Sequence, residues 1–299
     1  MDVIDAVVGS LRVGDAYGRR VGQRGEWGLR FSRFDGAGFH VVLAGTGWVA
    51  AGAMNPIPIG PGDVVLVPHG AGHALTHTPG YAALLTDVTT VTDTDDQPYD
   101  FEFLCGAYRL SQTPPHPFLG QLPDVVVVHP RGDDDRAELG ALASALDHDV
   151  RRSRGGSRVS RAALVDLMVV HLLRQVAVEQ RMTAWPAAAD PFLSPALRAM
   201  HEAPQRAWTA EQLGAVCNLS REAFSRRFAS MVGEPPMTYL RQLRLAAGAR
   251  LLRQTEEPLD AIARKVGYST GFAFAHAFRR EYGIAPGRFR SEPQVVSRP

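Results

Sequence analysis

The sequence predicts an α+β protein of two domains, in which a small all-β domain with following helices precedes an all-α domain. A chain of 299 residues has the length of two ordinary domains. Short apolar stretches separated by glycine and proline, which are typical of strands, occupy residues 27 to about 110. One helix-turn-helix pattern then occurs twice in the last third of the chain, which indicates a duplicated helical unit.

The first domain is expected over residues 1–183, with a β-barrel at about 1–130 and helices at about 137–182. Several of its apolar stretches alternate with small or polar residues, as in the strands of a barrel or sandwich. The clearest expected strands are 29–34, 39–43, 47–51, 63–67, 82–87 and 102–110, with a final β segment at 122–128.

Two helices are expected to follow the barrel, at 137–150 and 159–182. The second is apolar nearly all round, so we expect it to be buried on more than one side. Its neighbours would be the barrel and a second subunit, or the rest of its own chain alone. A linker rich in alanine and proline is expected at 184–191, before an all-α domain at 192–299.

The two helix-turn-helix patterns match in detail. In each, a short apolar-faced helix is followed by a turn, a hydroxyl residue and a second helix, which is expected at 221–232 and 271–282. Ser220 and Thr270 are placed to cap these second helices. Each second helix carries two phenylalanines four residues apart, which would form one buried stripe, and ends in glycine followed by proline.

The helix expected at 237–253 would hold the two patterns apart. Its length of about 25 Å is compatible with the ~34 Å between successive major grooves on one face of DNA. Charge agrees with this, since the chain from residue 191 onward has sixteen Lys and Arg against nine Asp and Glu, a net of +7, and the preceding part has a net of −6. A basic domain beside an acidic one is expected where phosphates are bound.

Residues 192–290 resemble the DNA-binding domain of the AraC/XylS family of transcription regulators. The signature lies in the segment 267–280 and continues through Gly283, Pro286, Phe289 and Arg290. The resemblance implies double-stranded DNA and RNA polymerase as partners. It also implies an interface of the two second helices, formed by Arg221, Glu222, Ser225, Arg226, Arg227, Gly271, Phe272, Ala275, His276, Arg279 and Arg280.

The two second helices differ in the side chains that they offer to bases. Arg226 is of the type that pairs with guanine O6 and N7. The second helix has few hydrogen-bonding groups, so we expect phosphate contacts from Arg279 and Arg280. Phe272 either contacts a thymine methyl group or packs inside the domain, and the sequence leaves both open.

The β domain resembles a cupin barrel. Gly62 and the segment 68–73, which ends in His73, fit the second cupin motif, with His77 in place of its usual asparagine. The first motif lacks its His-x-His pair, although His40 lies on the inward face of the matching strand. With Cys105 on a late strand, these features resemble the sensor domain of an AraC subgroup that includes reactive-chlorine-responsive regulators.

Three interpretations of His40, His73, His77 and Cys105 remain open at this point. They line a small-molecule pocket, hold a divalent metal such as zinc, or are core residues with local hydrogen bonds. We expect His40, His73 and Cys105 to form the responsive site, with a thiol whose pKa is lowered by the imidazoles. Cys217 lies in the other domain, so no structural disulfide is expected.

The combined interpretation is a DNA-binding transcription regulator controlled by an effector, metal or redox signal in its β domain. It is expected to be a homodimer without enzymatic activity. No segment is apolar enough for a membrane span or basic enough at its start for a signal peptide, so we expect it in the cytoplasm. The alternatives are a cupin metalloenzyme with an accessory DNA module and a constitutive DNA binder whose barrel only dimerises.

Overall fold

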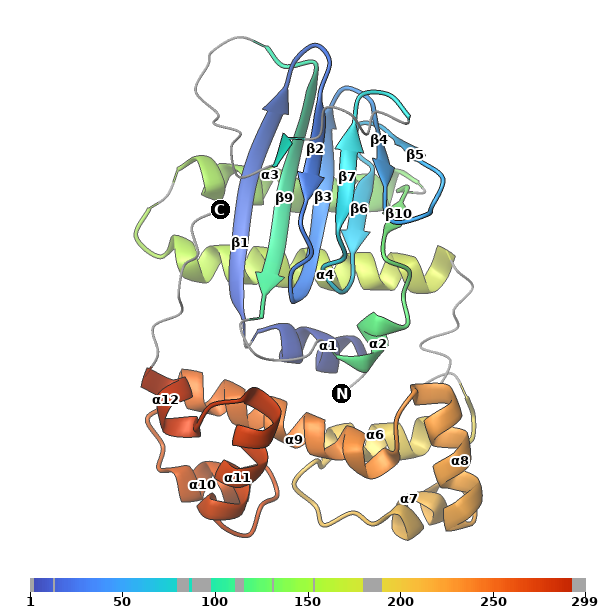
Figure 1. Ribbon diagram of the computed structural model, residues 1–299, viewed down its shortest axis with the longest axis vertical. Coiled ribbons are helices and arrows are strands. Elements are labelled where there is room, and N and C mark those ends of the chain that lie inside the picture. The colour runs from blue at the N-terminus through green and yellow to red at the C-terminus, as the bar shows by residue number, and fades with distance from the viewer. Residues whose placement is uncertain are drawn as a thin grey trace. The chain divides into compact units, whose positions relative to one another are not determined.

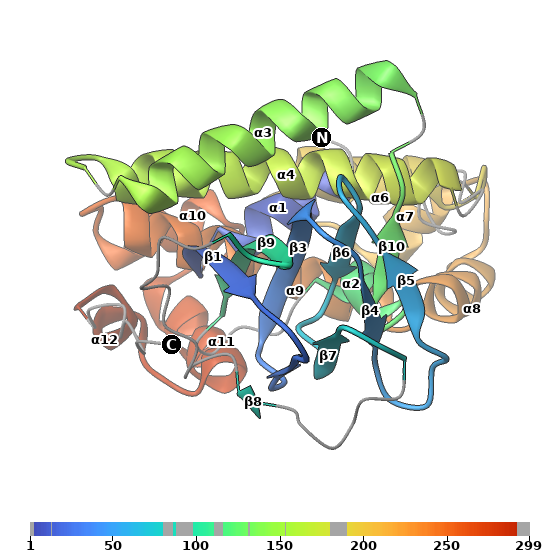
Figure 2. The same ribbon diagram turned by 90° about the horizontal axis from the view of Figure 1, so that it is seen from above.

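The computed structural model of the chain describes residues 3–12, 14–79, 86–87, 98–110, 116–130, 132–152, 154–179 and 190–291 (Figures 1 and 2). They fall into two compact units. The β unit contains the described residues of 14–111 and 119–176, and the helical unit contains those of 3–12, 116–118 and 177–291. The predicted α+β class with two domains is therefore confirmed.

The described part of the β unit contains two five-stranded sheets that enclose one apolar core. The first sheet has the order β1 (Asp15–Gln23), β9 (Phe101–Arg109), β3 (Gly36–Ala44), β6 (Val64–Val67) and β10 (Val126–Val128). The second has the order β5 (Ile57–Ile59), β4 (Gly47–Ala50), β7 (His73–Thr76), β2 (Gly28–Phe31) and β8 (Thr86–Asp87). All neighbouring strands are antiparallel except β2 and β8.

Strand β9 separates two environments, because successive side chains point to opposite faces of a sheet. Phe101, Phe103 and Cys105 pack in the core between the sheets. Tyr108 points the other way, and its hydroxyl donates to Asp166 over 2.7 Å. Every second residue of β9 therefore faces the interior of the barrel, and the intervening residues face the helices.

Helices α3 (Asp133–Arg151) and α4 (Ser157–Glu179) run side by side over the outer face of the first sheet (Figure 2). Arg20 of β1 anchors α3 through Asp147, at 3.0 Å, and also pairs with Glu102 of β9 at 2.7 Å. The apolar side of α4 is buried as predicted, but Val159 and Leu167 are 75% and 52% exposed. Among the described residues no helix is both long and apolar enough to cross a membrane.

The start of the barrel differs from the prediction. Its first strand begins at Asp15, and residues before it form helix α1 (Val3–Leu11), which belongs to the helical unit. Val7 and Leu11 are fully buried there. The short helix α2 (Pro117–Gly120) was also not expected. Most of the predicted linker, residues 184–189, and most of the predicted strand 82–87 lie outside the described residues, and the last β segment is shorter than expected.

The helical unit confirms both helix-turn-helix patterns. Its remaining helices are α6 (Ser194–Glu202), α7 (Ala210–Val216), α8 (Arg221–Val232), α9 (Pro236–Gln254), α10 (Leu259–Lys265), α11 (Gly271–Tyr282) and α12 (Pro286–Ser291). The bounds of α8 and α11 are those predicted. Ser220 and Thr270 accept hydrogen bonds from the third backbone N–H beyond them, and the four phenylalanines of the two stripes are fully buried.

The two turns are similar but not identical. Each contains one residue with left-handed backbone, Asn218 with φ 53° in the first turn and Gly267 with φ 87° in the second. One residue separates Asn218 from its capping Ser220, whereas two separate Gly267 from Thr270. Asparagine and glycine are the residues that adopt this conformation at least cost. The second turn is therefore one residue longer, a difference that the sequence comparison of the repeats did not show.

Gly248 lets α9 approach α11 closely, and we expect Gly248→Ala to destabilise the helical unit. An added Cβ would lie 2.6 Å from Cε2 of the buried Phe274. Overpacking of this kind costs about 1–3 kcal/mol, although alanine is the better helix former by about 1 kcal/mol. Calorimetric unfolding measures the effect. The control Gly287→Ala adds a Cβ with no atom within 4 Å, and equal stability of the two variants would contradict the close-packing argument.

Candidate functional sites

Helix α8 presents the charged face expected of a recognition helix. Arg221, Glu222 and Arg226 are exposed, Ser225 is half-buried, and Phe228 on the opposite face is fully buried. Among the described residues Arg226 has no ion-pair partner within the chain. Its guanidinium is therefore available to an external acceptor, as the prediction requires.

Arg227 is held within the helical unit. Its Nε and Nη2 donate to Oδ2 of Asp190 at 2.9 and 2.6 Å, and its guanidinium lies 4.6 Å from the ring centre of Phe192. Asp190 is buried and also accepts from the backbone N–H groups of Phe192 and Leu193. These hydrogen bonds and the cationic partner lower the pKa of Asp190 despite its burial. The arrangement fixes the start of the domain, a role that the sequence prediction of Arg227 as a DNA contact missed.

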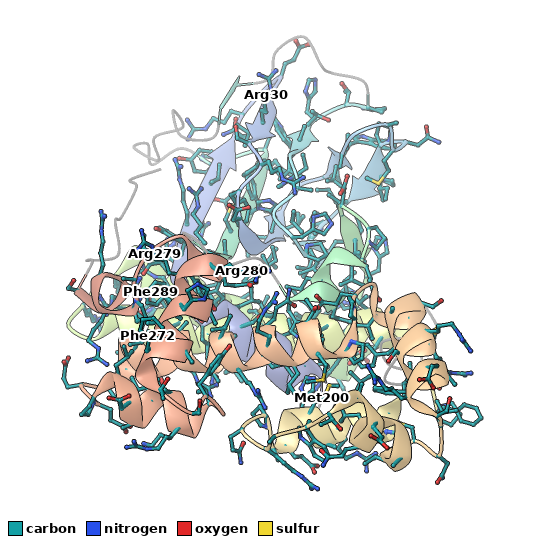
Figure 3. All side chains as sticks on the ribbon, turned by 60° about the horizontal axis from the view of Figure 1, so that its bottom comes forward. Arg30, Met200, Phe272, Arg279, Arg280 and Phe289 are labelled. Atoms are coloured by element: carbon teal, nitrogen blue, oxygen red, sulfur yellow. The ribbon has the colours of Figure 1, made fainter. Side chains whose placement is uncertain are left out.

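Helix α11 also divides its predicted residues between two roles. Phe272 is 83% exposed, and Arg279 and Arg280 are exposed on the same helix (Figure 3). His276 is exposed as well. Internal packing of Phe272, one of the two alternatives, is thereby excluded. Ala275 is half-buried.

Gly271 is buried at the start of α11, which corrects its predicted place on the exposed reading face. Its backbone N–H donates to Oδ1 of Asp260 at 2.7 Å, and an added Cβ would lie 2.6 Å from the same oxygen. A side chain at this position would therefore displace the Asp260 carboxylate that accepts from the start of α11.

In the β unit, the structure brings His40, His73 and Cys105 together, and we call these three residues the histidine–cysteine cluster. His40 Nε2 lies 2.7 Å from His73 Nε2, and His40 Nδ1 lies 3.1 Å from Cys105 Sγ. His73 Nδ1 lies 2.8 Å from the carbonyl oxygen of Ala71. Strand register explains the arrangement, since His40 is opposite Cys105 across β3 and β9.

The hydrogen bonds of the cluster have one consistent direction. A carbonyl oxygen only accepts, so His73 Nδ1 carries the hydrogen that is donated to Ala71. In neutral His73, Nε2 is then an acceptor for the N–H of His40 Nε2. In neutral His40, Nδ1 is in turn an acceptor, to which the Cys105 thiol donates. The chain of hydrogen bonds is therefore satisfied by two neutral imidazoles and a protonated thiol.

The electrostatics of the cluster favour the same protonation states. Burial lowers the pKa of His73 to about 4 and holds that of His40 well below its ordinary value. Burial also raises the pKa of Cys105 to about 12, although Arg19 opposes this. The prediction of a lowered pKa for the Cys105 thiol was wrong, because neutral imidazoles do not stabilise an anion and burial of the thiol dominates.

The tentative zinc site does not fit this geometry. His40 uses one ring nitrogen toward Cys105 and the other toward His73, so one ion cannot join all three. Two nitrogens on one tetrahedral zinc lie about 3.3 Å apart, against 2.7 Å here. His77 lies four residues beyond His73, or about 13 Å along the strand, with Nδ1 2.8 Å from the Trp27 carbonyl oxygen. Across the described chain no three His, Cys, Asp or Glu side chains are grouped for a metal.

The cluster lies in the wall of a cavity of about 300 Å³ within the β unit. Its lining also includes Tyr17, Gly18, Arg19, Arg30, Phe31, Ser32, Arg33, Phe34, Gly38, Phe39, Val67, Gly106, Ala107 and Arg109. Phe31 stacks on the His73 ring with centres 4.7 Å apart. The sequence predicted the three cluster residues but not the aromatic and arginine side chains around them. The signal for Arg109 was its position four residues after Cys105, on the same face of β9.

Comparison with known families matches both halves of the chain. Residues 2–177 match a family described as "Cupin", and residues 213–292 match one described as "Helix-turn-helix domain". Among curated relatives, the HTH-type transcriptional regulator MtrA of Neisseria gonorrhoeae is 26% identical over 98% of this chain and 99% of its own. A putative AraC-like transcription regulator of Streptomyces lividans is 28% identical over 99% and 100%.

A third relative is the RCS-specific HTH-type transcriptional activator RclR of Escherichia coli K12, 27% identical over 87% of this chain and 86% of its own. Among solved structures, the DNA-binding domain of AdpA in complex with a target DNA has 29% identity over 34% of this chain and 91% of that chain, with a TM-score of 0.33. ToxT of Vibrio cholerae O395 has 9% identity over 96% and 99%, with a TM-score of 0.39.

The lowered pKa of His73 predicts that acid destabilises the β unit. Between the unfolded pKa near 6.5 and the folded value of about 4, the unfolded chain binds the proton more strongly. Stability is therefore full above pH 6.5 and falls toward pH 4, by on the order of 3 kcal/mol from this residue. We expect His73→Gln, which cannot titrate, to remove that part of the loss. Hydrogen exchange of the β9 amides, corrected for intrinsic rates, measures it.

The control for this prediction is His148→Gln, which removes an exposed histidine from α3 of the same unit. It should leave the pH dependence unchanged. A His73→Gln protein with the same pH profile as the wild type would show that the buried imidazole is not the group responsible.

Proposed function

We propose that this chain, which belongs to the AraC-like transcription regulators and carries an N-terminal cupin domain and a C-terminal helix-turn-helix domain, couples a small molecule in the cavity of its β unit to DNA binding. The chain is a DNA-binding regulator rather than an enzyme. The observation that carries the proposal is the 300 Å³ cavity lined by the histidine–cysteine cluster. A ligand that binds one conformation better than another shifts their populations.

A small-molecule effector is favoured over a metal or redox signal. The cluster offers one ion no common set of ligands, and burial raises the pKa of the Cys105 thiol, whose Sγ lies 3.1 Å from His40 Nδ1. Oxidants react with thiolates, which this environment disfavours. The cavity, in contrast, has the size and the mixture of aromatic and polar groups that small-molecule sites share.

On the DNA side, we assign base readout to α8. To α11 we assign contacts with the DNA phosphates and an apolar contact with a base. Arg226 is an exposed guanidinium on α8 that has no ion-pair partner among the described residues. Arg279 and Arg280 follow Phe272 along the exposed face of α11, where phosphates and a thymine methyl group are the matching partners. The regulator is proposed to act as a homodimer together with RNA polymerase. Exposed Val159 and Leu167 of α4 are side chains that a second copy would cover.

The DNA assignment predicts different effects for three arginines. Arg226→Ala should cost about 1–3 kcal/mol at the preferred site and relax one base position. Arg279→Ala should weaken all sequences alike and reduce the salt dependence of binding by about one counterion. Selection from a random DNA library, followed by titration at several salt concentrations, measures both.

Arg227→Ala serves as the comparison, because Arg227 lies on the same helix as Arg226 but is paired with Asp190, which precedes α6. It should lower the unfolding temperature of the helical unit without changing the preferred sequence. If Arg226→Ala keeps the sequence preference of the wild type, α8 does not read bases through this residue.

The effector proposal predicts how the cavity variants respond. Ala107 lines the cavity on β9, so Ala107→Leu should fill it and abolish the response, while the exposed Ala141→Leu should not. Cys105→Ser keeps a hydrogen-bond donor toward His40 and should keep the response. The measurement is affinity for the selected DNA site with a zinc salt, hypochlorite or a library of small organic molecules.

Each kind of regulatory signal would give a different outcome in this measurement. A response to hypochlorite that Cys105→Ser abolishes would establish redox control in place of ligand control. A response to zinc alone would restore the metal interpretation. DNA affinity that no addition changes would make the protein a constitutive binder.

A further inference from the structure

The lining of the cavity has one sign of charge. It contains Arg19, Arg30, Arg33 and Arg109, and among the described lining residues there is no aspartate or glutamate. Neither Arg33 nor Arg109 forms an ion pair with any carboxylate that the structure describes. Two guanidinium groups without an ion pair at a concave site, here Arg33 and Arg109, create a positive potential that attracts anions.

The charges and the apolar surface occupy different depths of the cavity. Arg33 and Arg109 are exposed, whereas His40 and His73 are buried, so the arginines lie at the rim and the imidazoles at the inner end. Strand β9 follows the same gradient, because Cys105, Ala107 and Arg109 occupy successive positions on its interior face. An elongated ligand would therefore have one end against the uncharged inner wall and the other end beside the arginines at the rim.

Aromatic side chains fix the rim and supply the apolar wall. The Arg109 guanidinium lies 5.4 Å from the ring centre of Tyr17 and 5.5 Å from that of Phe34. These contacts orient the guanidinium without using its hydrogen-bond donors on a carboxylate. Further in, Phe31 is stacked on His73.

The inner end contributes no charge of its own. Both imidazoles are kept neutral by burial, and their ring nitrogens are already used within the cluster and by the Ala71 carbonyl. A buried charged group of the ligand would find no partner there, and an apolar group would.

We propose that the cavity binds a small organic anion, a carboxylate with an aromatic or short aliphatic body, whose charged end meets Arg109 and Arg33 and whose body lies against Phe31 and Phe34. The volume of about 300 Å³ is at the lower end of ligand pockets, so the body is of the size of one ring. Arginine binds a carboxylate through two parallel hydrogen bonds, which sets its orientation. The inference names the class of the effector proposed above.

The test is calorimetric titration of the full-length protein with benzoate, benzamide and benzylamine, which share one body and differ in charge. Benzoate should bind at least about tenfold more tightly than benzamide, since it gains a charge-assisted pair, and benzylamine should not bind. Arg109→Gln should weaken benzoate by about tenfold and leave benzamide unchanged. Arg109→Lys keeps the charge but not the two parallel hydrogen bonds, so its affinity for benzoate should lie between those of the wild type and Arg109→Gln.

Arg158→Gln is the matched control, since it removes an exposed arginine of α4 that does not line the cavity. It should bind benzoate like the wild type. Equal affinity for benzoate and benzamide, or preference for benzylamine, would overturn the inference. The effector proposal is tested separately by DNA affinity. Benzoate that binds without changing DNA affinity would support the ligand class and contradict effector control. If only neutral compounds change DNA affinity, effector control is supported and the anionic ligand class is contradicted.

Discussion

The hydrogen-bond chain from the Ala71 carbonyl to the Cys105 thiol determines the chemistry of the β unit. A carbonyl oxygen only accepts, so it fixes the hydrogen on His73 Nδ1, and with neutral imidazoles each following donor and acceptor then has one role. The desolvation of buried charge favours the same state. A site of this kind is poor at holding a cation or a thiolate and well suited to form a rigid, neutral wall for a ligand. The same residue types would be reactive in a wetter or more charged environment.

Strand register places these groups and also separates the tasks of one strand. On β9 the residues at odd positions face the interior, and Tyr108 on the other face reaches Asp166 of α4. One face of this nine-residue strand thus lines the cavity, and the other face attaches the covering helix α4. A shift of register by one residue would exchange them, so the packing that fixes the register also fixes the site.

The helical unit shows how a repeated scaffold acquires two different surfaces. Its two stripes of phenylalanine and its two capping hydroxyls are equivalent. Their surfaces differ, since α8 exposes Arg226 and α11 exposes Phe272. Beside these residues, Arg227 bonds to Asp190 and the backbone of Gly271 bonds to Asp260, and both contacts support packing. Neighbouring residues on one recognition helix therefore have different roles. A residue that bonds to a nearby carboxylate supports the packing of the domain, and a residue without such a partner stays available at the surface.

The sequence by itself determined the elements whose causes are local. Capping residues, apolar periodicity and glycine stops fixed α8 and α11 to the residue, and strand alternation placed His40, His73 and Cys105 on interior positions. Only the tertiary structure decided the protonation of Cys105, the arginines at the cavity rim, the separation of His77 and the place of α1 in the helical unit. Burial and partners from distant strands set these properties, and neither is encoded in the spacing of nearby residues.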